Sequence, residues 1–240
     1  TAVVAPWAEA RSGDRLRARG AVEFRLLGPA NIDSLEQTAD PRTIQPHTTR
    51  IQDAWIGTHG DWVDITLGAD RIHWGMADGF SVVDRINPWD LTDPTRFEQR
   101  LSVPMAHVVL HRGAIQIDLV AVPFFQPAAL PSTSVDITAT ASDLFDAEAT
   151  GAGEMQIGTL ETRLATPERQ LQSSTLGTRM RWMTPWVDLE LSYSQGPDTM
   201  PQVDGDLSLV GFQTNQDRVD IAVPMRYPHI GVAGMALRAE

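Results

Sequence analysis

The stretch "RLRARGAVEFRLL", residues 15–27, shows most clearly how this chain is built. Its even positions, from Leu16 to Leu26, are apolar or small, and its odd positions, from Arg15 to Arg25, are mostly charged. Successive side chains of a β-strand point to opposite faces, so this alternation predicts a strand with one apolar face and one charged face. The stretch is also long for a strand of a soluble protein, in which about five or six residues are usual.

The same alternation recurs along the chain. In residues 63–70, Val63, Ile65 and Leu67 oppose Asp64 and Asp70. The period of two indicates an all-β protein, because a helix would repeat its apolar positions at three and four residues. Further strands of this kind are expected at 114–120, 187–194 and 218–227.

The connections between the predicted strands alternate between short and long. Short turns are expected at 12–14, 58–61, 111–113, 184–186 and 214–217. Long loops are expected at about 29–47, 76–100, 126–173 and 196–205. An antiparallel up-and-down transmembrane β-barrel has this asymmetry, with short turns at one end and long loops at the other. We therefore predict one domain over residues 1–240 that forms such a barrel or a large part of one.

Composition and charge narrow the possible functions. The 240 residues include 31 acidic and 19 basic side chains, a formal net charge of −12, which argues against nucleic acid as a partner. Cysteine is absent, so disulfides and cysteine-ligated metals are excluded. No apolar run is long enough for a transmembrane helix, whereas a membrane-spanning strand needs only about 9–11 residues and has ordinary hydropathy.

Signals for catalysis or metal binding are weak. The sequence has no G-x-S-x-G nucleophile motif, and its histidines are scattered. His107 and His111 are four residues apart, which on a strand separates them by about 13 Å, too far to share one ion. We expect no catalytic residue, no metal site and no cofactor.

On the barrel reading, three groups of residues are candidates for function. The charged strand positions are expected to line the lumen: Arg15, Arg17, Arg19, Glu23, Arg25, Asp64, Asp70, Asp118, Asp188 and Glu190. Polar residues of the 76–100 loop are expected to constrict the barrel: Asp78, Asp84, Arg85, Asn87 and Asp90. Tryptophans near strand ends are expected at the lipid–water interface: Trp7, Trp55, Trp62, Trp182 and Trp186.

Several motifs resemble those of the DUF1302-type Gram-negative outer-membrane β-barrels. The stretch "ITLGADRIHWGMADGFSVVDRINPWDL" is similar to the family's "LGxQxxxWG" strand followed by "INPxDL". Here that pattern is carried by Leu67, Gly68, Trp74 and Gly75, followed by Ile86, Asn87, Pro88, Asp90 and Leu91. Residues 101–131 and 176–202 resemble two later family hairpins, so the matches run in order over about residues 48–204.

The resemblance implies a location in the Gram-negative outer membrane and contact with its lipid. It implies a porin-like channel or transporter of a small or lipidic solute, and either an open pore or a barrel plugged by paired charges. Two alternatives remain: a structural or adaptor barrel in a larger envelope complex, and a soluble all-β binding module. We expect the chain to be a segment of a longer barrel, or to complete its barrel with other envelope proteins or copies of itself, because an open sheet edge cannot remain in lipid.

Overall fold

The computed structural model describes residues 2–26, 47–75, 81, 83–92, 96, 98–130, 156–168, 170–204, 208–213 and 218–239. These residues form β-strands, connecting segments and short 3-10 turns such as η5 (Leu171–Ser173), so the all-β class is confirmed. Within these ranges no helix has the length and apolar character needed to cross a membrane.

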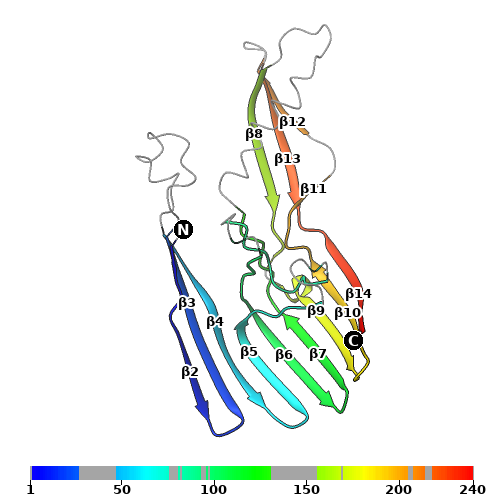
Figure 1. The fold of residues 1–240 in the computed structure, drawn as a ribbon. Helices are drawn as coiled ribbons and strands as arrows, with labels where there is room; N and C mark the ends of the chain where they lie inside the picture. The colour runs from blue at the N-terminus through cyan, green and yellow to red at the C-terminus, as the bar shows by residue number, and fades with distance from the viewer. Residues whose placement is uncertain are drawn as a thin grey trace.

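Ten strands form one antiparallel sheet (Figure 1). Its order is β1-β3-β4-β5-β6-β7-β9-β10-β14, and β2 continues the edge beside β3. The strands are β1 (Ala2–Val4), β2 (Trp7–Ser12), β3 (Leu16–Leu26), β4 (His47–His59), β5 (Val63–Asp70), β6 (Val103–Arg112), β7 (Ile115–Val122), β9 (Thr175–Met183), β10 (Val187–Pro197) and β14 (His229–Ala239).

The short turns lie together at the lower end of this sheet in Figure 1. They join β2 to β3, β4 to β5, β6 to β7 and β9 to β10, at the positions predicted from the sequence. Gly13 and Gly113 occupy two of these turns at φ angles of 62° and 60°, a left-handed conformation that favours glycine. The fifth predicted turn, 214–217, lies outside the described residues.

A second, smaller sheet departs from the predicted up-and-down topology. It contains β8 (Gln156–Ala165), β11 (Gln202–Val203), β12 (Ser208–Gln213) and β13 (Arg218–Arg226). β8 pairs with β13 in parallel, although it falls inside the long loop expected at 126–173. The register of this pair shifts between Ile157 and Leu160 of β8. The apolar residues of β8 therefore change from odd to even positions, and the sequence shows no continuous alternation there. The loop expected at 196–205 likewise contains the end of β10 and all of β11.

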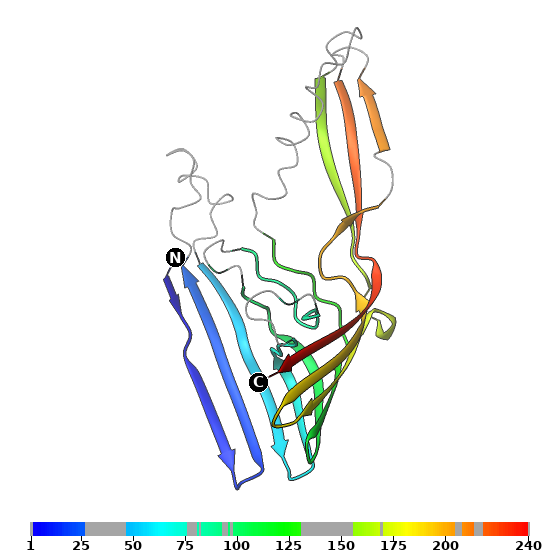
Figure 2. The same cartoon turned by 45° about the vertical axis from the view of Figure 1, so that its right-hand side comes forward.

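The ten-stranded sheet is curved but open. In Figure 2, strands β9, β10 and β14 of this sheet come forward of β5, β6 and β7. The sheet therefore bends around one of its faces. Among the described strands, no pairing joins β14 to β1 or β2. The described residues therefore form an open antiparallel sheet and no closed barrel, and a barrel or a large part of one stays a prediction.

The two faces of this sheet are reversed relative to those of a soluble β-sandwich. Apolar residues such as Leu67 and Met235 lie on one face with exposed fractions of 51% and 72%. Charged residues such as Asp118 and Glu190 lie on the other with exposed fractions of 1% and 3%. Among the described strand residues of this sheet, only one Asp, Glu, Lys or Arg points to the apolar face. It is Arg112, beside the β6–β7 turn. We call these the outer face and the inner face.

The inner face is covered by the described part of the connection between β5 and β6, residues 71–75, 81, 83–92, 96 and 98–102, which we call the inner segment. Its Ile72, Trp74 and Ile86 form a small apolar core with residues of β6 and β7, namely Val103, Met105, Val120 and Val122. Trp74 also lies against Gly177 of β9, where a Cβ atom would come within 2.5 Å of its ring. The main buried apolar contacts of the sheet therefore attach this connection to its charged face.

Candidate functional site: the charged inner face

Asn87 holds the two ends of the inner segment together. Its side chain is fully buried, and its Oδ1 accepts a hydrogen bond from the backbone N–H of Ile72 at 2.9 Å. Its Nδ2 donates to the carbonyl oxygens of Asp70 and Leu101, each at 2.9 Å. Because Asp70 ends β5 and Leu101 lies just before β6, one amide group closes the segment into a loop.

Arg100 supports the same loop from within. Its Nη1 donates to the Asn87 carbonyl at 3.0 Å, and its Nη2 lies 3.6 Å from Oδ2 of Asp84. Its guanidinium group stacks 3.1 Å from the centre of the Trp89 ring. Burial lowers the pKa of Arg100 to about 10, which leaves the group protonated at neutral pH.

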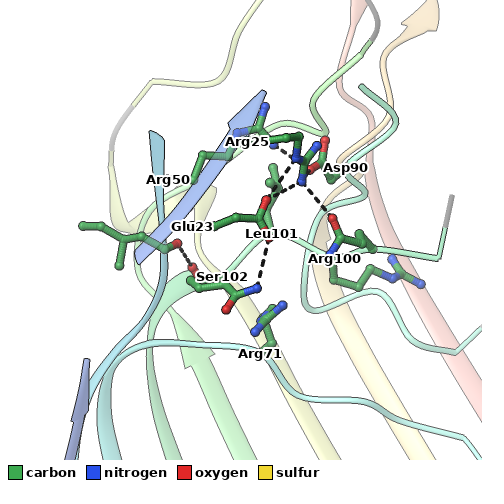
Figure 3. A pocket seen from close by; sticks show the side chains of 11 residues that line it. Glu23, Arg25, Arg50, Arg71, Asp90, Arg100, Leu101 and Ser102 are labelled. Atoms are coloured by element: carbon green, nitrogen blue, oxygen red, sulfur yellow. Dashed lines mark hydrogen bonds and ion pairs between the residues drawn. The ribbon is translucent and has the colours of Figure 1, made fainter. Parts of the chain in front are cut away.

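A first charged cluster, Glu23, Arg25, Arg50 and Asp90, ties the inner segment to β3 and β4 (Figure 3). Arg25 Nη2 donates to Glu23 Oε1 at 2.6 Å and to Asp90 Oδ2 at 2.8 Å. Arg50 Nη1 lies 2.7 Å from the same Asp90 oxygen. Burial alone would raise the pKa of Asp90, but the Thr92 hydroxyl and the two guanidinium groups hold that pKa below its usual value.

A second charged cluster, Asp118, Arg179 and Glu190, ties the segment to β7, β9 and β10. Arg179 Nη2 donates to Asp118 Oδ1 at 3.1 Å, and its Nη1 donates to the His73 carbonyl at 3.1 Å. Glu190 Oε1 accepts a hydrogen bond from the Gly75 N–H at 2.9 Å. The inner segment is therefore anchored to both halves of the sheet, and these charges pair with protein groups.

Between the two clusters, the inner face keeps an open groove of about 390 Å³. Asp53 lies in its wall, with its two carboxylate oxygens 3.1 Å from Arg19 Nε and 3.4 Å from Arg71 Nη2. The lining residues are Arg19, Asp53, Trp55, Asp70, Arg71 and His73.

The residues predicted to line a lumen mostly share the inner face. Arg15 is the exception, because it lies in the exposed β2–β3 turn before β3 begins. Asp64 lies near the short turns and contacts His111 Nε2 at 3.1 Å. The others on this face are Arg17, Arg19, Glu23, Arg25, Asp70, Asp118, Asp188 and Glu190.

The predicted constriction residues lie in the inner segment, except for Asp78, which falls outside the described residues. Asp84, Asn87 and Asp90 are buried in the contacts described above. Arg85 forms an ion pair outside these contacts: its Nη2 lies 3.1 Å from Oδ1 of Asp198, the residue that follows β10.

The predicted interface tryptophans divide into two groups. Trp62, Trp182 and Trp186 are exposed near the short-turn end, as expected of an aromatic girdle. Trp55 instead lies on the inner face, because a bulge opposite Ala21 and Val22 shifts the phase of β4 at Gln52 and Asp53. Trp7 pairs with the inward residue Ala21 and lies 5.4 Å from the Arg19 guanidinium carbon, so it also lies on the inner face.

Five residues of the inner face are not among those predicted from the sequence: Arg50, Asp53, Arg71, Arg100 and Arg179. Arg179 follows the alternation of β9 and was open to detection from its strand phase. The inward position of Asp53 depends on the β4 bulge, and the role of Arg100 depends on the tertiary path of the inner segment, so neither follows from local periodicity.

Comparison with known proteins gives no relative: no family model matches the chain, and neither does a curated protein or a solved structure. Within the described ranges, no group of three or more His, Cys, Asp or Glu side chains is arranged to hold a metal ion. The described inner face combines paired charges that fix a segment with an open groove beside Asp53.

Proposed function

We propose that this chain forms the wall and the constriction of a Gram-negative outer-membrane β-barrel. The barrel would act as a porin-like channel or transporter for a small solute. The observation that carries the proposal is the reversal of the two faces. An uncharged apolar outer face suits lipid, and a charged inner face suits a lumen. A soluble module would have to leave a large apolar surface in water, where contiguous exposed patches of this size are rare.

The height of the apolar surface supports the proposal. Outward apolar residues of β3 run from Leu16 near the short turns to Phe24 near the far end. Eight residues of strand rise about 26 Å, close to the roughly 25 Å apolar band of outer-membrane barrels. Three exposed tryptophans, Trp62, Trp182 and Trp186, mark the lower border of that band.

The inner segment supports a narrow passage rather than a wide pore. Two buried charge clusters and an apolar core anchor it to both halves of the sheet. A segment held this firmly narrows the interior at all times, so we propose size-limited passage and no catalytic role.

The open sheet edges belong to the proposal as well. In lipid, the unpaired backbone groups of β1, β2 and β14 need partners, because each unsatisfied group costs several kcal/mol. We propose that strands from the same longer protein, from a second copy or from another envelope protein complete the barrel.

Fractionation tests the membrane location. The protein is expected to float with liposomes and to resist extraction by alkaline carbonate. Recovery of a folded monomer from the aqueous fraction without detergent would contradict the proposal and favour the soluble binding module.

Conductance in planar bilayers tests the passage. Small single-channel steps are expected from the wild type, and larger ones when Asp90→Ala and Glu190→Ala release the inner segment. No channel events from wild type or variant, together with a stable co-purifying envelope protein, would favour the adaptor. One observation favours that second candidate: the sheet of β8 and β13 extends beyond the ten-stranded sheet, where it is available for protein contacts (Figure 1).

A further inference from the structure

In the groove beside Asp53, two arginine side chains from different elements meet and keep hydrogen-bonding capacity for a ligand. We propose that it binds a small organic anion with one carboxylate and a planar ring. This assignment deepens the proposed function by naming a solute class, and it rests on that function only for the solute's passage through a membrane.

Two guanidinium groups share a single carboxylate at this site. Arg19 and Arg71 approach opposite oxygens of Asp53, at 3.1 Å and 3.4 Å. Each guanidinium carries five N–H donors, so one carboxylate satisfies only a minority of them. Arg71 Nε is buried and has no hydrogen-bond partner within the described residues. A second carboxylate, supplied by a ligand, fits these donors in the fork geometry that arginine prefers.

The surroundings of the two arginines select the rest of the ligand. Trp55 lines the same groove and offers an apolar ring surface against which a planar group stacks. Asp70 also faces the groove, and its Oδ1 is already used as an acceptor of the Arg71 backbone N–H at 2.8 Å. Its negative charge disfavours a second anionic group nearby, so a ligand with a single carboxylate fits best.

A basic path leads to the groove from the short-turn end of the sheet. Arg17 and Arg19 occupy successive inward positions of β3, about 7 Å apart, and Arg15 lies in the turn below them. Two acids lie close to these residues: Asp14, which precedes Arg15 in the turn, and Glu9 of β2, which pairs with Arg19 and which Arg11 binds at 2.6 Å. The three arginines outnumber them. This column of positive charge raises the local concentration of anions along the wall.

Equilibrium dialysis of labelled benzoate against the full chain in detergent micelles tests the assignment, with protein-free micelles subtracted. Saturable binding is expected, and unlabelled benzamide, which has the same shape without the charge, should compete at least tenfold more weakly than benzoate. This comparison needs no variant. Equal competition by the two compounds, or no saturable binding by folded wild-type protein, would overturn the assignment.

Variants locate the site. Arg71→Gln and Arg19→Gln are each expected to weaken benzoate binding at least tenfold. The matched control is Arg181→Gln, which makes the same change on the inner face of β9, three strands from β5. Equal weakening in all three folded variants would reject the groove as the site and leave only a general charge effect.

The two proposals fail in different ways. Benzoate binding by a chain that does not float with liposomes would reject the membrane proposal and retain the groove. Liposome insertion without benzoate binding would reject the groove and retain the membrane proposal.

Discussion

The outer and inner faces of the ten-stranded sheet have the same alternation in the sequence and opposite environments in the structure. On β5, Leu67 is exposed on the outer face, while Asp70 faces the groove beneath the inner segment. On β7, Leu119 is exposed, and its direct neighbour Asp118, which points inward, is buried against Arg179. Alternation thus establishes that two faces differ, and only burial shows which of them the protein covers.

This comparison assigns a different physical role to each face. The inner face is stabilised by specific ion pairs and hydrogen bonds to the inner segment, which depend on geometry. The outer face makes few contacts within the chain, so its contribution depends on the solvent around it. Substitutions on the inner face should therefore change the free energy of unfolding in any medium. Substitutions on the outer face should change it only in lipid.

The largest effect is expected from breaking the second charged cluster. Asp118→Ala leaves the Arg179 charge buried without its main partner and should lower the free energy of unfolding by about 3–5 kcal/mol. Denaturant titration in detergent and in vesicles measures this loss. The double variant Asp118→Ala/Arg179→Met should recover part of it, because it removes the unpaired arginine, although Glu190 then loses the Arg179 Nη1 contact at 3.9 Å. A loss below about 1 kcal/mol for the single variant would mean that the inner face is wet in solution.

The next effect is on the outer face. Leu67→Arg places a charge near the middle of the apolar band and should cost about 2–4 kcal/mol in vesicles. The control is Leu171→Arg in η5, outside the sheet, where the leucine is 78% exposed and a change within about 0.5 kcal/mol is expected. If both variants unfold like the wild type in vesicles, Leu67 is in water and the outer face is not a lipid surface.

A smaller effect is expected where the inner segment meets the sheet. Gly177→Ala places a Cβ atom 2.5 Å from the Trp74 ring, so the segment has to shift, at a cost of about 1–3 kcal/mol. Gly20→Ala is the matched control, because nothing lies within 4 Å of a Cβ atom there. Denaturant titration and Trp fluorescence compare the two variants. Equal stability would show that Trp74 does not pack on β9.

The smallest effect is expected from pH at the first cluster. Because the pKa of Asp90 is lowered, its ionised carboxylate contributes fully to the free energy of unfolding above the ordinary pKa of 3.8. This contribution is lost as the pH falls through the lowered pKa. Hydrogen exchange of the inner segment measures this contribution as the difference between wild type and Asp90→Asn, which removes the titrating group. The difference should be constant from pH 7 to pH 5 and shrink only below about pH 4. A difference that already shrinks above pH 5 would contradict the ion pairs of Asp90.

Local alternation was enough to predict the regular part of the fold. β5 spans Val63–Asp70, the bounds of the alternating stretch in the sequence, and the chain leaves the sheet at Arg71, where the phase of the pattern breaks. The charged strand residues share one face because each keeps phase with its neighbours in register.

Features that depend on long-range pairing were not predictable in this way. The bulge at Gln52 and Asp53 reverses the phase of β4, so Trp55 lies in the groove rather than at a lipid interface. β8 joins a strand more than fifty residues later, and in parallel. The groove itself combines Arg19 of β3, Asp53 of β4 and Arg71 of the inner segment, which no sequence spacing connects.

The orientation of the two faces is tested most directly by spin labels on adjacent residues of β5. The chain contains no cysteine, so Leu67→Cys and Thr66→Cys each give one labelled site, on the outer and the inner face. In vesicles, the Leu67 label should collide readily with oxygen, which concentrates in lipid, and rarely with a water-soluble nickel chelate. The Thr66 label should show much less preference for oxygen. A Leu67 label that meets the nickel chelate as often as the Thr66 label does would contradict a lipid-facing outer surface.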